Sequence, residues 1–378
     1  MKILLLAGEE SGVLYANRIR AEALEAYPNA EIRGYGDYGF RIADLAVMGI
    51  GQVLRKFFYF LRVKRTMERA IAEWKPDVVC TVDYPGMNLR LARFAKARGC
   101  RAVHVVCPQV WAWKRGRIPK IEASLDRLCC FFPFEPALFK PGFAEFVGHP
   151  LAESFQTSQS NNRLTEKANN QILLAVLPGS RMGEIEKHMP VLLAVIRRLR
   201  GAANLPGGGL RAVIPAANER AFRTIERMLA RGAADGVELV RGGARDVLRQ
   251  ADAAVVASGT ATLEAALVGC PTVLVYRVGW LFAAIARRVI KGVKHIGLAN
   301  IIAEKAGRAC PMKEFLQEDF TVENVIGALL PLLTDRQAND RARAELAGTM
   351  ELMKTKTGGG AISRIVRQFL ADRQHSNI

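Results

Sequence analysis

The sequence offers little from which a disulfide framework or a metal site could be built. Its 378 residues include seven cysteines, none of them in a CxxC pair, and five histidines, none at metal-ligand spacing. Most of the cysteines lie inside apolar runs, as free thiols in a reducing compartment do. We therefore expect no disulfide, no metal site and a cytoplasmic location.

Long apolar runs are also absent. No uninterrupted run approaches the length that spans a bilayer, and the apolar segment after Met1 is too short for a signal peptide. The opening residues instead indicate a first buried strand.

Acidic residues are scarce beside basic ones. The 36 Asp and Glu residues stand against 54 Lys and Arg residues, which leaves a formal net charge of +18. This excess favours anionic partners such as nucleic acid, phosphorylated substrates or an anionic membrane face. No nucleic-acid motif is recognisable and the basic residues stand beside aromatic ones, so nucleic acid is the least favoured of the three.

What the chain does contain is an alternation of short apolar runs with helical patterns. The alternation predicts an α/β fold of parallel sheets covered on both faces by helices, and two sets of runs predict two sheets. The first set lies at residues 3–7, 78–82, 102–106 and 128–132, and the second at 172–177, 212–215, 237–240, 253–257 and 272–276.

A polar stretch rich in Asn and Ser, residues 153–170, predicts an interdomain connection. It separates a Rossmann-like domain of residues 1–152 from a second one of residues 171–356. A glycine-rich break precedes a last helix, within residues 357–378, which we expect to pack back on the first domain. Ligands of such sheets bind beyond the carboxyl ends of the strands, so the expected site is a cleft between the domains.

One turn in the second half is suited to a nucleotide. Ser258, Gly259 and Thr260 end a buried strand and open a helix, which leaves backbone N–H groups free for an anion. Glu264, one helical turn further on, is placed to accept hydrogen bonds from a ribose. An ordinary strand-to-helix turn with a solvated glutamate fits this stretch equally well.

A second turn, Gly179-Ser180-Arg181, is the sharper phosphate signal. Its backbone donors and its fixed cation suit a pyrophosphate. The first βα turn, residues 7–12, has two glycines and a serine that also permit close approach of a phosphate, although a purely structural turn is as good an interpretation.

Candidate residues of the first half also follow predicted strands. Asp83 ends a buried strand before a Pro-Gly turn, where partial burial would let it take a proton from an attacking hydroxyl; a helix-capping aspartate is the alternative. The loop with Trp113 and Arg115 suits a sugar or a phosphorylated headgroup, unless its tryptophans only fill the core. His149, near the end of the domain, could contact a phosphate.

Two basic, aromatic segments predict contact with a membrane surface. Residues 45–65 combine apolar and basic residues without an acid, which suits a helix in an anionic interface. A core helix with basic ends is the alternative. Residues 276–294 repeat the pattern in the second domain. The predicted surface residues are Arg55, Phe57, Phe58, Phe60, Arg62, Lys64 and Trp280.

Taken in chain order, these features resemble the lipid-A-disaccharide synthase family of inverting glycosyltransferases of the GT-B class. The resemblance covers nearly the whole chain outside residues 153–170. The stretches that carry it are residues 7–12, 45–49, 82–85, 108–113, 146–149, 177–181, 257–261 with Glu264, 276–277 and 298–300.

The resemblance implies a reaction. In it, 2,3-diacylglucosamine passes from its UDP conjugate to 2,3-diacylglucosamine 1-phosphate, forming a β-1,6 disaccharide and UDP without a metal or another cofactor. The resemblance also implies a peripheral enzyme of lipopolysaccharide synthesis on the cytoplasmic face of the inner membrane of a Gram-negative bacterium. It leaves a homodimer open.

The resemblance also implies roles for individual residues. Asp83 would activate the acceptor hydroxyl, and Arg181 would neutralise charge on the departing UDP. Glu264 would hold the ribose. The other nucleotide-sugar contacts would be Gly179, Ser180, Ser258, Gly259, Thr260, Tyr276 and Asn300, and the acceptor contacts Ser11, Gly12, Asn88, Trp113, Arg115 and His149.

Several positions depart from the family's usual pattern. Val13 and Ala16 stand where an aspartate and a glycine are usual, Gln52 replaces a glutamate, and residues 107–109 read Cys-Pro-Gln instead of Ser-Pro-Ser. The loss of an acid beside the implied acceptor site keeps two alternatives open. One is a GT-B UDP-sugar enzyme that catalyses another reaction, such as an epimerase. The other is a membrane-associated relative that binds a nucleotide without turnover. The synthase is favoured because the three residues implied for catalysis and ribose binding remain.

Overall fold

The computed structural model describes residues 1–41, 44, 57–157, 171–201, 205, 209–231, 236–279, 292, 294–355 and 360–369. Within this range it leaves out the side chains of Glu10, Ser11, Gln156, Thr157 and Arg231. The chain forms two compact units, one of residues 1–153 with 355–378 and one of residues 154–354.

The first unit is built on a parallel sheet of six strands in the order β2-β1-β3-β4-β5-β6. The central strands consist of apolar residues buried on both faces, as parallel strands under helices require. The strands are β1 (Lys2–Ala7), β2 (Glu31–Arg33), β3 (Val78–Val82), β4 (Arg101–Val105), β5 (Arg127–Cys130) and β6 (Ala144–Phe146).

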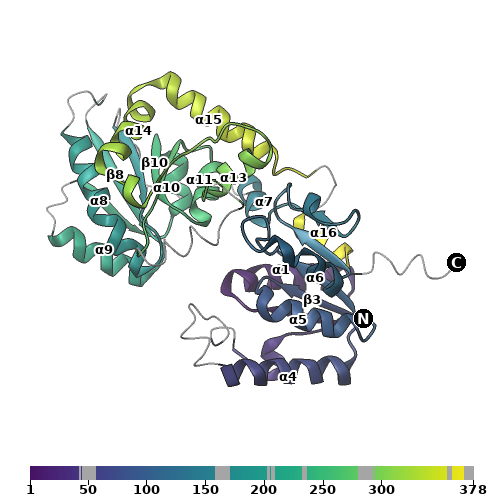
Figure 1. Ribbon diagram of the computed structural model, residues 1–378. Coiled ribbons are helices and arrows are strands. Elements are labelled where there is room, and N and C mark those ends of the chain that lie inside the picture. Colours follow the sequence, from purple (N-terminus) through teal and green to yellow (C-terminus); the bar gives the residue numbers. More distant parts are fainter. Residues whose placement is uncertain are drawn as a thin grey trace. The chain divides into compact units, whose positions relative to one another are not determined.

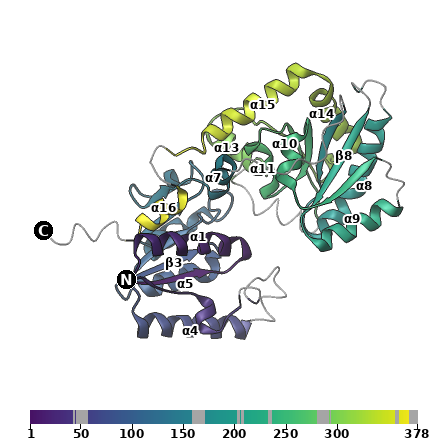
Figure 2. The ribbon, with the colours of Figure 1, turned by 180° about the vertical axis from the view of Figure 1, so that it is seen from behind.

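Helices cover both faces of this sheet, with α4 and α5 on one side and α1 and α16 on the other (Figures 1 and 2). Alternate residues of β1 supply the two cores, because side chains along a strand point to opposite faces. The helices are α1 (Glu10–Ala26), α4 (Phe57–Trp74), α5 (Pro85–Lys96), α6 (Ile118–Ser124), α7 (Pro150–Thr157) and α16 (Ala361–Arg367), with the 3-10 turns η1 (Tyr35–Tyr38), η2 (Arg115–Arg117) and η3 (Pro136–Leu138).

The second unit repeats the plan with a parallel sheet in the order β12-β11-β10-β7-β8-β9. The expectation of two parallel sheets is therefore confirmed. The strands are β7 (Ile172–Leu177), β8 (Leu210–Ala216), β9 (Val237–Arg241), β10 (Ala253–Ala257), β11 (Thr272–Tyr276) and β12 (Lys313–Leu316).

The helices of the second unit also lie on both faces of its sheet. Side chains of α8, α9 and α14 form the core on one face, and those of α10 and α11 form it on the other; Figure 1 shows where these helices lie beside the sheet. The helices are α8 (Met182–Arg200), α9 (Glu219–Arg231), α10 (Ala244–Gln250), α11 (Thr260–Leu267), α13 (Leu298–Lys305), α14 (Val322–Thr334) and α15 (Arg336–Glu351), with the 3-10 turn η4 (Gln317–Asp319).

Three strands escaped prediction from the sequence, namely β2, β6 and β12. Each has only three or four residues and lies at an edge of its sheet. An edge strand pairs on one side only and is partly exposed, so it needs no continuous apolar run. Apolar runs therefore identified the central strands and the longer edge strand β9, and missed these three shorter edges.

The last helix belongs to the first unit, as the sequence predicted. Ile365 and Phe369 complete the core beside α1. Arg364 is 2% exposed and donates from Nη2 to Glu153 Oε1 at 2.8 Å and from Nε to the Val147 carbonyl at 2.6 Å. The Glu153 carboxylate also accepts a hydrogen bond from the Ala361 N–H, at the start of α16. An ion pair between the buried Arg364 and the half-buried Glu153 therefore fixes α16 to the first unit.

Within the part of the chain that the structure describes, none of the helices has both the length and the apolar character needed to cross a membrane.

Replacing Arg364 tests how much this ion pair contributes to stability. Arg364→Met removes the ion pair with Glu153 and the hydrogen bond to the buried Val147 carbonyl, so we expect the free energy of unfolding to fall by about 2–4 kcal/mol. Urea unfolding measures the change, and hydrogen exchange in α1 and α16 locates it. Lys354→Met, which removes an exposed ion pair with Glu351, should cost less than about 1 kcal/mol. Equal costs would contradict this account.

Candidate functional site

The candidate residues lie near the switch point of each sheet, where later strands are added on the opposite side of the first strand. In the first sheet, β1 lies between β2 and β3, and in the second, β7 lies between β8 and β10. Open α/β sheets bind ligands at such switch points, beyond the carboxyl ends of the strands. Gly12 and Asp83 follow β1 and β3, while Arg181 and Ser258 follow β7 and β10. Each unit thus carries one cluster.

Asp83 sits in a strained turn after β3. Asp83 and Tyr84 have φ values of 51° and 52°, which is unusual for residues other than glycine. The Tyr84 N–H donates to Asp83 Oδ1 at 2.8 Å. Burial raises the pKa of Asp83, and this backbone hydrogen bond opposes part of the rise. The carboxyl group is half-buried, so it combines some exposure with a basicity above that of an ordinary aspartate.

Asn88 holds this turn from behind. Its Nδ2 donates to the carbonyls of Asp83 at 2.8 Å, Val82 at 3.2 Å and Leu6 at 3.3 Å, and its Oδ1 accepts from the Tyr35 hydroxyl at 2.8 Å. The side chain is fully buried, so its amide is occupied by the protein. The resemblance placed Asn88 among the acceptor contacts, but this geometry gives it a supporting role for Asp83.

The first βα turn packs directly against Tyr84. A Cβ added to Gly8 would lie 2.5–2.7 Å from side-chain atoms of Tyr84, which is closer than a real contact allows. At Gly12, the nearest atom to an added Cβ would be 3.5 Å away, at the Val82 carbonyl. The side chain of Ser11, another predicted acceptor contact, lies outside the described residues.

The tryptophan loop divides into a buried part and an exposed part. Trp111 is buried, and its Nε1 donates to Glu135 Oε1 at 3.1 Å. Trp113 is half-buried with the Lys114 ammonium 4.7 Å from its ring centre, and Arg115 is exposed in η2. The core interpretation therefore holds for Trp111, whereas Trp113 and Arg115 remain accessible to a ligand.

His149 is a poor candidate for holding a phosphate by charge. It is buried against Phe131 and Phe132, and its Nδ1 accepts from the Leu151 N–H at 3.1 Å. Burial lowers its pKa to about 4, so the ring is neutral at pH 7.

Among the described residues, Cys107, Cys130 and Glu135 form the group with metal-ligand geometry, and their ligand atoms lie within 4.8 Å of one another. All three are buried. Burial raises the pKa of Glu135 to about 8 and that of the Cys130 thiol well above its usual range. The Glu135 carboxyl already accepts hydrogen bonds from Trp111 and from the Phe132 N–H. A carboxyl group that already accepts two hydrogen bonds gives this cluster a role in supporting the tryptophan loop.

In the second unit, the adjacent strands β11, β10 and β7 bring the predicted phosphate turns together. Gly179 and Gly259 have φ values of 112° and 151°, which L side chains rarely adopt. Arg181 is 61% exposed and its Nη1 lies 3.1 Å from Glu184 Oε1. The two turns therefore lie side by side at one edge of the sheet, and the exposed Arg181 guanidinium belongs to the first of them.

Glu264 lies on α11, close behind the turn that follows β10. It is half-buried, and burial raises its pKa while the charge of Arg245 opposes the rise. A half-buried carboxylate near the predicted phosphate turns can accept hydrogen bonds from ribose hydroxyls, so its surroundings fit the predicted contact.

Two other predicted nucleotide contacts are occupied within the protein. The Tyr276 hydroxyl donates to Glu184 Oε1 at 3.3 Å. Asn300 is fully buried, its Nδ2 donating to the Met312 carbonyl and to Glu314 Oε1 and its Oδ1 accepting from the Met312 N–H. Asn300 therefore joins α13 to β12, a role that spacing along the chain could not reveal.

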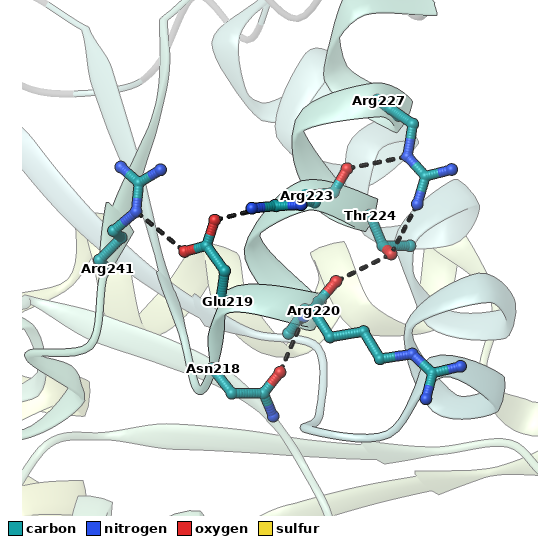
Figure 3. Close-up of polar contacts among 8 residues, drawn as sticks. Asn218, Glu219, Arg220, Arg223, Thr224, Arg227 and Arg241 are labelled. Atoms are coloured by element: carbon teal, nitrogen blue, oxygen red, sulfur yellow. Dashed lines mark hydrogen bonds and ion pairs between the residues drawn. The ribbon is translucent and has the colours of Figure 1, made fainter.

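An arginine-rich network near the carboxyl ends of β8 and β9 was missed by the sequence reasoning (Figure 3). Glu219 accepts from Arg223 Nε at 3.0 Å and from Arg241 Nε at 3.2 Å. Asn218 accepts from the Ala221 N–H through Oδ1, and its Nδ2 lies 3.5 Å from the Ser180 carbonyl. The turn after β8 thus contacts the phosphate turn after β7. The Asn-Glu-Arg run of residues 218–220, just after β8, was the available signal.

Helix α4, in the first basic segment, has features of both a core helix and a membrane-surface helix. Val63 and Met67 pack in the core, and Phe60 is partly buried against it. Phe57 and Phe58 are 50% and 82% exposed. Arg62 is exposed and Lys64 pairs with Glu68. The buried side makes α4 a core helix, while its first turn presents aromatic rings to solvent. Arg55 and Trp280 lie outside the described residues.

Two solved structures share this architecture. One, of S. aureus MnaA with UDP, has a TM-score of 0.62 at 15% identity and covers 99% of this chain and 97% of that one. The other, of Acinetobacter baumannii MurG, has a TM-score of 0.55 at 12% identity and covers 98% of this chain and 99% of that one. The fold and the two clusters therefore define a two-domain α/β protein of the GT-B class, as predicted.

Sequence comparison narrows the class to a family. The family profile described as lipid-A-disaccharide synthetase matches residues 3–357. The lipid-A-disaccharide synthase of Syntrophus aciditrophicus is 34% identical over 91% of each chain, and that of Geobacter metallireducens is 34% identical over 99% of this chain and 98% of its own. The chain belongs to the lipid-A-disaccharide synthase family, glycosyltransferases of lipid A synthesis.

The contrast between Gly8 and Gly12 tests the packing of the first turn. Gly8→Ala forces the Tyr84 ring away and with it Asp83, so we expect the free energy of unfolding to fall by about 1–3 kcal/mol. Gly12→Ala, inside α1, should leave stability unchanged or raise it by up to about 1 kcal/mol. Urea unfolding of both variants measures the difference. A destabilised Gly12→Ala beside a neutral Gly8→Ala would contradict the described packing.

Proposed function

We propose that the protein transfers 2,3-diacylglucosamine from UDP-2,3-diacylglucosamine to the 6-hydroxyl of 2,3-diacylglucosamine 1-phosphate. The products are the β-1,6-linked disaccharide 1-phosphate and UDP. Family membership supports the reaction, and the observation that carries the assignment of residues is a half-buried Asp83 held at the switch point of the first sheet.

In this proposal, each unit handles one substrate. The first unit binds the acceptor near Gly12, Trp113 and Arg115. Asp83 accepts the proton of the acceptor hydroxyl while the hydroxyl oxygen attacks the anomeric carbon of the donor. The bond from that carbon to the diphosphate breaks with inversion, and UDP leaves.

The second unit binds the donor. Backbone N–H groups of the turns at Gly179-Ser180 and Gly259-Thr260 face the diphosphate, and Arg181 neutralises the charge that develops on it. Glu264 accepts hydrogen bonds from the ribose hydroxyls. Exposed donors and a cation that are already in place lower the cost of organising the leaving group.

The departures at Val13 and Ala16 favour no alternative reaction in this structure. Ala16 is buried in the core of the first unit, and Val13 packs partly against it. These small apolar residues fill space behind the first turn, so the acceptor chemistry rests on Asp83.

We also propose that the first turn of α4 contacts an anionic membrane on its cytoplasmic face. Phe57 and Phe58 offer exposed rings, and Arg62, Arg65 and Arg69 border the same helix surface. Aromatic rings beside arginines suit the boundary between acyl chains and anionic headgroups.

The reaction is tested with purified protein in detergent, the UDP-sugar donor and the monosaccharide 1-phosphate acceptor, by following UDP and disaccharide by mass. We expect disaccharide from the unmodified chain and a kcat lower by about 10²–10⁴-fold for Asp83→Asn, which keeps the side-chain shape but cannot accept the proton. The activity of the unmodified chain should fall as pH drops through the pKa of Asp83, above its ordinary 3.8. UDP binding without any product would instead favour a different acceptor or a protein without turnover.

Membrane binding is tested by sedimentation with phosphatidylglycerol vesicles and with neutral phosphatidylcholine vesicles. We expect binding to the anionic vesicles that is weakened by salt. For Phe58→Ser we expect an approximately tenfold lower partition constant, because the variant lacks the ring that inserts among the acyl chains. Leu14→Ser, at an exposed leucine of α1, should bind as the unmodified chain does. The same loss for both variants, or equal binding to both vesicles, would overturn the proposal.

A further inference from the structure

The exposed Arg181 is held by a residue that the sequence reasoning passed over. Glu184, on the first turn of α8, is buried, and its Oε1 lies 3.1 Å from Arg181 Nη1 and 3.3 Å from the Tyr276 hydroxyl. Long arginine side chains lose conformational freedom when they act, so an anchored guanidinium acts at lower entropic cost. Glu184 is thus placed to aim Arg181.

Glu184 also packs against the phosphate turn itself. A Cβ added to Gly179 would lie 2.7 Å from Glu184 Oε2 and 3.0 Å from Glu184 Cβ. The turn can come this close only because residue 179 is a glycine with a φ of 112°. The carboxylate therefore supports the backbone of the turn as well as the arginine that follows it.

His188, one helical turn further along α8, ties the same turn to a different strand. The Arg277 N–H donates to His188 Nε2 at 2.9 Å, so Nε2 is the acceptor and Nδ1 carries the proton. Nδ1 then donates to the Pro178 carbonyl at 2.7 Å. The ring is fully buried beside Tyr276 and Phe320, and burial lowers its pKa. This neutral tautomer is the one that satisfies both bonds.

The two chain segments that His188 joins follow strands that are not neighbours in the sheet. Pro178 follows β7 and Arg277 follows β11, and β10 lies between these two strands. One imidazole therefore fixes the spacing of the two strand ends on either side of the Ser258-Gly259-Thr260 turn. Both phosphate turns of the proposed donor site depend on that spacing.

We infer that Glu184 and His188 are positioning residues of the donor site, Glu184 by aiming Arg181 at the diphosphate and His188 by holding the phosphate turns in register. The inference rests on the proposed donor function of the second unit. Neither residue touches the donor; both act through groups that do. Binding of UDP alone, without acceptor or turnover, is the direct readout.

Calorimetric titration with UDP tests the role of Glu184. Glu184→Gln keeps an acceptor oxygen but loses the charge that holds Arg181, and we expect UDP affinity to fall about tenfold. In the Arg181→Met background, the same substitution should have little further effect, because glutamine keeps the packing against Gly179 and the arginine that the charge holds is gone. A purely structural role predicts the same loss in both backgrounds and would overturn the inference for Glu184.

The role of His188 is tested in the same titration. His188→Ala should weaken UDP binding, and His188→Asn should recover part of the loss because its amide N–H can replace the bond to Pro178. Steady-state kinetics should show a higher KM for the UDP-sugar and an unchanged KM for the acceptor. Equal affinities for the two variants, or a change in the acceptor KM alone, would overturn the inference.

A matched control separates positioning from general loss of stability. Arg343, on α15, donates to the carbonyls of Gly269 and Ala251 in the same unit. Arg343→Met should lower the urea-unfolding midpoint and leave UDP affinity unchanged. If the unmodified chain fails to bind UDP, the inference and the donor function fall together. If it binds UDP and the Glu184 and His188 variants bind it equally well, the inference alone falls.

Discussion

In a parallel sheet every strand presents its carboxyl end at the same edge, and the rest of this structure depends on that constraint. The first strand of each unit has neighbours on both sides, so the chain must add later strands first on one side of it and then on the other. Helices that leave neighbouring strands toward opposite faces open a crevice there. Asp83 in one unit and Arg181 in the other follow strands at these two points, which explains how residues distant in sequence form two clusters.

The two clusters are built in the same way. In each, a functional side chain belongs to a turn with positive φ values, at Asp83 and Tyr84 in the first unit and at Gly179 in the second, and a fully buried polar residue behind the turn satisfies its backbone. Asn88 does this for Asp83, and His188 does it for the turn before Arg181. Because the supporting residues are buried and fully bonded, they restrict the motion of the turns without occupying the space of a ligand. Positions of this kind store strain that the surrounding core has to offset.

Much of this arrangement was predictable from the chain, and the failures share physical causes. The apolar runs identified the central strands because those strands are buried on both faces. They missed β2, β6 and β12 because edge strands are short and partly exposed. Candidate residues at strand ends were found where a glycine turn marked them. Asn300 and His149 were assigned to ligands, whereas the structure has them buried, with the Asn300 amide bonded to β12 and the His149 ring against Phe131.

The sequence by itself determined the two-sheet architecture and the family, because alternating apolar runs and ordered motifs are local patterns that need no coordinates. It also placed Asp83, Arg181 and Glu264 at the ends of buried segments. Only the tertiary structure decided which polar residues face a ligand and which support the turns, as Glu184, His188 and Asn88 do. That choice depends on contacts that spacing along the chain does not predict, such as those of Glu184 with Tyr276, His188 with Arg277 and Asn88 with Leu6, whose partners are 82 to 92 residues apart.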